Sequence, residues 1–133
     1  MTQGLLVVDA SAVIGWLMPD EAASNLDALA RDFASLAAPW LLWAEVRNML
    51  VLAERKGRVV PGLIDSMILR VERLGIRLDM EPDNGLVLSI ARQHGLTVYD
   101  ALYLDLAVRT SATLATLDRQ LASAAVARGV PVV

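Results

Sequence analysis

The chain alternates short apolar runs with longer segments of helical periodicity. The first run, Leu5–Val8, has four consecutive large aliphatic residues, which is typical of a strand buried on both faces of a sheet. Further short extended segments are predicted at residues 37–39, 76–78, 113–118 and 130–133. Between them, apolar residues spaced three and four apart predict helices over 12–18, 20–36, 41–56, 61–74 and 82–93. Two more helices are predicted, one that begins at 98 and one that follows the segment 113–118 and ends at 127. This alternation predicts an α/β fold with a central parallel sheet of four to five short strands flanked by helices.

The length and the apolar content favour one well-packed domain, which we expect to span residues 1–133. Hydrophobic residues make up 56% of the chain, which is more than in an average soluble domain. The additional apolar residues must lie in the core or on surface that another chain covers. No apolar run approaches the ~18 residues of a transmembrane helix, so no membrane span is expected. The first residues also lack the basic region and cleavage site of a signal peptide.

The polar composition excludes several kinds of chemistry. There is no cysteine, which rules out disulfides, thiol catalysis and thiolate metal sites. The net charge of −3 argues against binding nucleic acid through bulk electrostatics. All basic residues except Lys56 are arginine, which suits bidentate contacts with phosphate, although a bias in genome composition explains the same pattern. These absences favour a cytoplasmic location.

Two acids stand directly at the ends of predicted strands. Asp9 follows the first strand, and Asp118 ends the segment that begins at Thr113. Since the carboxyl ends of parallel strands share one edge of the sheet, both carboxylates are predicted at the edge where α/β proteins bind ligands. The alternative for Asp9 is a helix N-cap, a common role for Asp before an apolar-periodic segment.

Two further acids are predicted near the same edge, at the starts of helices. Glu45 lies among the apolar positions of the 41–56 helix, where a buried acid costs several kcal/mol unless something satisfies it. Asp100 falls in the first turn of a helix that Thr97 can cap, and a favourable interaction with the helix dipole is the alternative role for it. Asp105 points about 140° away from Asp100 and is expected on the surface. His94, the sole histidine, is expected on the surface at a helix end.

Four converging acids would repel one another unless a cation lay between them. Oxygen donors without His or Cys specify a hard cation, Mg²⁺ or Mn²⁺, with Ca²⁺ less favoured. Such an ion activates water and neutralises charge on a phosphodiester, which predicts a metal-assisted phosphoryl or phosphodiester enzyme.

Four segments in order carry a family resemblance: VVDAS (7–11), AEVRNML (44–50), YDALYLDLA (99–107) and ATLATLDRQL (112–121). They resemble the acidic motifs of PIN-domain proteins, and their order, spacing and total length resemble the VapC-type ribonuclease toxins of toxin–antitoxin pairs. The resemblance covers essentially the whole chain. It departs from the family at Asp105, where an apolar or small residue is usual, and at Thr110–Ser111, where glycine is frequent.

The resemblance implies a fold, a set of site residues and an activity. The fold is a three-layer α/β/α sandwich. The metal-binding and catalytic acids would be Asp9, Glu45, Asp100 and Asp118. Ser11 and Thr116 would supply hydroxyls near the metal or its water. The activity would be Mg²⁺- or Mn²⁺-dependent endonucleolytic cleavage of RNA by metal-activated water, with an RNA target that the sequence does not identify.

The resemblance also implies partner chains: a second copy in a homodimer, and an antitoxin whose C-terminal segment covers a groove and places an arginine at the acids. The candidate groove or interface residues are Trp16, Leu17, Trp40 and Trp43, with burial in this chain's own core as the equal alternative. The cations that could meet RNA phosphate are Arg47, Arg92, Arg109 and Arg119, none of them favoured over the others.

Four other functions are alternatives to a toxin nuclease, and each needs different residues or partners. A PIN nuclease of RNA processing would use the same acids without an antitoxin, and a neighbouring small reading frame would distinguish the two. A non-catalytic RNA- or protein-binding module would not need four unpaired acids. A phosphoacceptor receiver domain needs a lysine opposite the acids, which Lys56 at a helix end does not supply. A haloacid-dehalogenase-like phosphatase needs an acid where Ser11 stands.

Overall fold

A four-stranded parallel sheet forms the centre of the protein. The computed structural model describes residues 4–18 and 25–133. Within them the strands are β1 (Leu5–Val8), β2 (Ser35–Pro39), β3 (Arg77–Asp79) and β4 (Thr113–Ala115). They pair in parallel in the order β3-β2-β1-β4, with β1 between β2 and β4. This confirms the predicted parallel sheet, and Val7 and Val8 are fully buried as expected for a central strand.

Seven helices follow in the described residues. They are α1 (Ala10–Leu17), α2 (Leu26–Asp32), α3 (Leu41–Arg55), α4 (Ile64–Arg73), α5 (Asn84–His94), α6 (Val98–Thr110) and α7 (Arg119–Ala127). Helices α4 and α5 begin two or three residues later than predicted, and β3 is shifted by one residue.

Two predicted elements are wrong at their ends. The predicted 20–36 helix, whose beginning lies outside the described residues, ends at Asp32, because the chain from Ser35 pairs with β1. Pairing with a buried strand here outweighs the helical spacing of the apolar residues. The predicted strand at 130–133 is reduced to a single parallel bridge between Val132 and Leu114.

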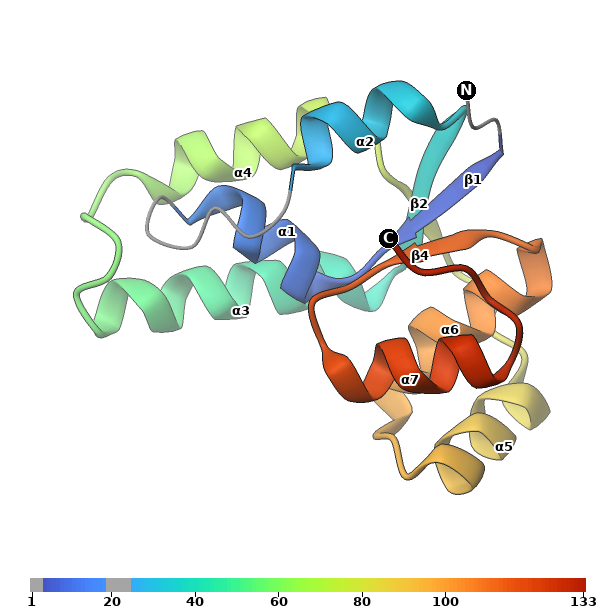
Figure 1. The fold of residues 1–133 in the computed structure, drawn as a ribbon. Helices are drawn as coiled ribbons and strands as arrows, with labels where there is room; N and C mark the ends of the chain where they lie inside the picture. Colours follow the sequence, from blue (N-terminus) through green and yellow to red (C-terminus); the bar gives the residue numbers. More distant parts are fainter. Residues whose placement is uncertain (1–3, 19–24) are drawn as a thin grey trace.

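The helices lie in two groups on the two sides of the sheet (Figure 1). Helix α6 packs on β1 and β2 and is itself covered by α5 and α7. On the other side, α1 packs against α2 and α3, and α4 lies along α3. This is the predicted three-layer sandwich, and its core holds residues of both helix groups and of the sheet. None of the helices within the described residues is long and apolar enough to cross a membrane.

One departure from the family pattern lies at the end of α6. Ser111 is the C-cap residue and has a φ of 53°, in the left-handed region. Glycine is the usual residue at such a position because it has no Cβ to clash. The helix end therefore has the geometry that glycine favours, although serine occupies it.

Candidate active site

Asp9 lies at the carboxyl end of β1 and is almost completely buried, with 5% of its surface exposed. Its Oδ1 accepts the N–H of Ala12 at 2.9 Å, so Asp9 caps α1. The same oxygen accepts the hydroxyl of Ser11 at 2.7 Å, and Oδ2 accepts the hydroxyl of Thr116 at 2.5 Å. The N-cap role and the place at the sheet edge are thus both correct, because the cap holds the carboxylate at that edge.

Ser11 and Thr116 connect Asp9 to the turn after β4. The Ser11 hydroxyl accepts the N–H of Leu117 at 2.8 Å, and that of Thr116 accepts the N–H of Asp118 at 3.0 Å. Each hydroxyl therefore donates to Asp9 and accepts a backbone N–H from the turn after β4. Together they fix the ends of β1 and β4 relative to each other.

Asp118 repeats the arrangement of Asp9 at the end of the neighbouring strand. It caps α7 through Oδ1, which accepts the N–H of Leu121 at 2.9 Å. Its side chain is partly buried. Since β1 and β4 are adjacent and parallel, the two capping carboxylates lie at the same edge of the sheet.

Glu45 and Asp100 reach the same region from α3 and α6. The hydroxyl of Tyr103, one turn after Asp100, donates to Glu45 Oε1 at 2.5 Å. Thr97 caps α6 as predicted, its hydroxyl accepting the N–H of Asp100 at 3.1 Å. Both carboxylates are partly buried. We call Asp9, Glu45, Asp100 and Asp118 the acidic cluster.

The members of the acidic cluster act on one another electrostatically. Burial raises the pKa of Asp9, three hydrogen bonds oppose this, and the charge of Asp118 raises it further. Burial raises the pKa of Glu45, the bond from Tyr103 opposes this, and the charges of Asp100 and Asp9 add to the rise. Burial and the charge of Asp118 raise the pKa of Asp100. None of the ion pairs that the described residues form with one another includes a member of the cluster.

The donor set fits a hard divalent cation. All four donors are carboxylates, and a cation among them would relieve the repulsion that, together with burial, raises the pKa values of Asp9, Glu45 and Asp100. Within the part of the chain that the structure describes, no three Asp, Glu, His or Cys side chains are grouped closely enough to enclose an ion by themselves. Mg²⁺ does not need such a cage, since it keeps several waters and takes one or two carboxylates plus substrate phosphate.

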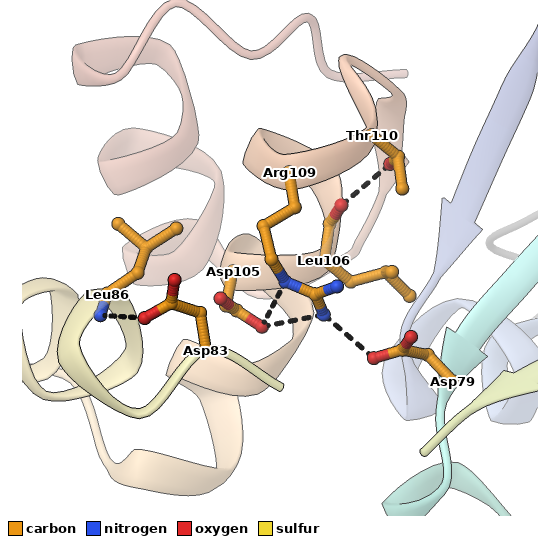
Figure 2. Close-up of polar contacts among 7 residues, drawn as sticks. All are labelled: Asp79, Asp83, Leu86, Asp105, Leu106, Arg109 and Thr110. Carbon is orange, nitrogen blue, oxygen red and sulfur yellow. Dashed lines mark hydrogen bonds and ion pairs between the residues drawn. The ribbon is translucent and has the colours of Figure 1, made fainter. Parts of the chain in front are cut away.

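Asp105 is not on the surface, and that prediction is wrong (Figure 2). Its side chain is fully buried because α6 is covered by the sheet, α5 and α7, so that every residue from Ala101 to Ala107 is buried. Oδ2 of Asp105 accepts from Arg109 Nε at 3.0 Å, and Arg109 also contacts Asp79 at 2.7 Å. Arg109 therefore joins α6 to β3 and is not free to bind phosphate.

The four residues predicted to form a groove or interface differ in burial. Leu17 is in the core, and Trp16 is partly buried under the guanidinium of Arg70. Trp40 and Trp43 are exposed, Trp43 to 56%, with Arg47 over its ring at 4.0 Å. Arg92 and Arg119 are exposed, and His94 is partly buried at the end of α5, where it accepts from Arg128.

No role was predicted for Tyr103, which the structure brings to Glu45 from 58 positions away in the chain. The only local signal is its position one turn after Asp100, and that spacing is equally typical of a core residue.

Comparison with known proteins identifies the family of this chain. A model of the PIN domain matches residues 6–127, a range that contains the whole acidic cluster. The chain therefore belongs to the PIN-domain family. Ribonuclease VapC3 of Pyrobaculum aerophilum is 32% identical to it over 120 residues, which cover 88% of this chain and 92% of that protein. The crystal structure of PAE2754 from Pyrobaculum aerophilum is similar with a TM-score of 0.74 and 28% identity, covering 92% of this chain and 87% of that one.

Proposed function

We propose that this protein is a metal-dependent endoribonuclease that hydrolyses phosphodiester bonds of RNA, and that it is the toxin of a toxin–antitoxin pair. The observation that carries the proposal is the acidic cluster, which gathers four carboxylates from four parts of a PIN-domain chain. Burial and the charges of other members raise the pKa values of Asp9, Glu45 and Asp100, and no ion pair among the described residues neutralises the cluster. The likeness to a protein named Ribonuclease VapC3 supports the substrate class.

Carboxylates of the acidic cluster, together with bound waters and the substrate phosphate, would hold Mg²⁺ or Mn²⁺ at the carboxyl edge of the sheet. When bound, the ion lowers the pKa of an attacking water and neutralises charge on the phosphodiester. The protein keeps Asp9 oriented through the Ala12 N–H and two hydroxyls, so its carboxylate does not need to reorganise. Asp118 is oriented by its cap bond to α7, which leaves Oδ2 for the ion or its water.

Partner chains of this protein are proposed on the exposed apolar residues of α3 and α4 and of the turn before α3. Trp40, Trp43, Val51 and Leu69 are exposed on or beside α3 and α4. A hollow lies between these helices and β3, lined by Leu42, Trp43, Val46, Arg47, Val71, Glu72, Ile76 and Leu78. Aromatic side chains commonly anchor such contacts, so a cognate antitoxin segment and a second copy in a homodimer are the proposed partners. The proposed RNA substrate implies action in the cytoplasm.

Cleavage of RNA by the purified, partner-free protein tests the function. We expect cleavage with Mg²⁺ or Mn²⁺, none with EDTA, and a loss of about a hundredfold or more in Asp9→Asn and Asp100→Asn, since the ion is worth several kcal/mol in the transition state.

Asp83→Asn is the matched control, because Asp83 caps α5 as Asp9 caps α1, and Asn caps equally well. The charge of Asp83 is not among the causes that raise the pKa values of Asp9, Glu45 and Asp100. Equal cleavage by all variants would mean that the cluster is not the active site. A folded wild type that binds Mn²⁺ but cuts no RNA would favour a binding module.

A further inference from the structure

Tyr103 is the largest of the fully buried side chains among the described residues, with 1% of its surface exposed. It extends from α6, and its hydroxyl donates to Glu45 Oε1 on α3 at 2.5 Å. A bond this short is typical of a hydroxyl donating to a charged carboxylate. Helices α3 and α6 lie in different layers of the sandwich, so this hydrogen bond joins the two layers at the acidic cluster.

Core packing alone does not explain the hydroxyl. The aromatic ring fills space between α6 and the rest of the core, and phenylalanine would fill that space equally well. The hydroxyl instead donates its hydrogen to Glu45 Oε1, and phenylalanine would leave this carboxylate without that donor.

Glu45 needs such a partner more than Asp9 or Asp118 does. Those two aspartates are short side chains held by the N–H groups of the helices that they cap. Glu45 has one more rotatable bond and stands inside α3, where the backbone N–H groups are used by the helix itself. Tyr103 supplies from another element the orientation that a cap supplies to the aspartates.

We propose that Tyr103 is a positioning residue, which holds Oε1 of Glu45 so that Oε2 is presented to the cation. This inference rests on the proposed metal-dependent nuclease function. It makes Tyr103 a contributor to metal affinity through Glu45, without contact of its own with the metal or the RNA. Partners that orient a metal ligand typically change metal affinity by ten- to a hundredfold when they are removed.

The test is a titration with Mn²⁺, followed by electron paramagnetic resonance of the free ion, in wild type, Tyr103→Phe and Tyr99→Phe. Tyr103→Phe is expected to bind Mn²⁺ about tenfold more weakly. Tyr99→Phe is the matched control, since Tyr99 lies on the same helix, is 61% exposed and loses the same hydroxyl. It is expected to bind as wild type does.

A double-mutant cycle with Glu45→Ala separates positioning from a general loosening of the core. If Tyr103 acts through Glu45, the double variant binds Mn²⁺ no more weakly than Glu45→Ala does. In cleavage assays at a fixed, limiting Mn²⁺ concentration, Tyr103→Phe is expected to lower kcat with little change in KM for RNA. Losses that add in the double variant would overturn the inference.

Two further results keep this inference separate from the proposed function. Wild type that binds Mn²⁺ and cuts RNA, together with Tyr103→Phe that binds equally tightly, would overturn the role of Tyr103 alone. Wild type that neither binds Mn²⁺ nor cuts RNA would overturn both. If Tyr103→Phe does not fold, Glu45→Asp retains the tyrosine and withdraws the carboxylate from it; we expect a similar tenfold loss, and wild-type affinity there would contradict the inference.

Discussion

Helix α6 takes part in two groups of acids that differ in how their charge is balanced. At its start, Asp100 belongs to the acidic cluster, whose members repel one another and form no ion pair within the described residues. Farther along, Asp105 is more deeply buried than any of them, yet it pairs with Arg109 at 2.9 Å, and Arg109 also binds Asp79 (Figure 2). Asp105 and Asp79 raise the pKa of Arg109, which keeps it charged.

The difference shows that burial of an acid is a poor guide to function in this fold. Asp105 is a structural residue because its counter-ion comes from its own helix, four residues on. Its Oδ1 has no hydrogen-bond partner among the described residues, but the charge as a whole is compensated. The acidic cluster has carboxylates held in place by caps and hydroxyls, and no counter-ion pairs with them among the described residues. We propose that an external cation balances their charge. We expect the two groups to respond with opposite sign when one charge is removed.

Asp105→Asn is expected to have the larger effect on stability. The amide cannot pair with the charge of Arg109, and the partly buried guanidinium loses its fully buried partner. Removing one member of such a pair leaves the other uncompensated, so we expect the free energy of unfolding to fall by about 2–3 kcal/mol. Urea denaturation measures this change in the free energy of unfolding. A change of less than about 0.5 kcal/mol is typical of an ordinary surface substitution. Such a result would mean that the ion pair of Arg109 with Asp105 does not stabilise the fold.

Asp9→Asn is expected to act in the opposite direction, with a smaller magnitude. In the metal-free protein it removes a buried charge, and Asn can keep the cap bond to Ala12 and donate to Thr116. We expect the free energy of unfolding at pH 7 to rise by about 1 kcal/mol.

The gain in Asp9→Asn should depend on pH with a definite sign. Because the folded-state pKa of Asp9 is raised above 3.8, folding disfavours the ionised carboxyl, and this penalty is fully present only above the folded-state pKa. The advantage of Asn should therefore shrink as the pH falls from 7 toward 3.8. Denaturation of both proteins over that range checks it, and an advantage that grows on acidification would contradict the raised pKa.

The strand-end part of the site could be predicted because it is local in sequence. Asp9 and Asp118 each follow an apolar strand directly, so their place at the sheet edge depends only on the strands being parallel. Their capping bonds reach three residues along the chain, a distance over which sequence patterns are reliable.

The contacts that depend on packing between elements could not be predicted. Helical spacing gives the direction of Asp105 relative to Asp100, but it does not say how many sides of α6 are covered. The bond of Tyr103 to Glu45 joins two helices far apart in sequence. The predicted end of the helix before β2 was wrong for the same reason, since the pairing of Ser35 with Leu5 places Ser35 in a strand.

The most direct test of the central claim is the effect of Mn²⁺ on unfolding of wild type, Asp9→Asn and the Asp83→Asn control. An ion at 100 times its dissociation constant stabilises a folded protein by about 2.7 kcal/mol. We therefore predict that Mn²⁺ stabilises wild type and Asp83→Asn by about this amount at saturating concentration and stabilises Asp9→Asn much less, so that wild type becomes the more stable of the two. Equal stabilisation of all three proteins, or of none, would contradict a metal site at the acidic cluster.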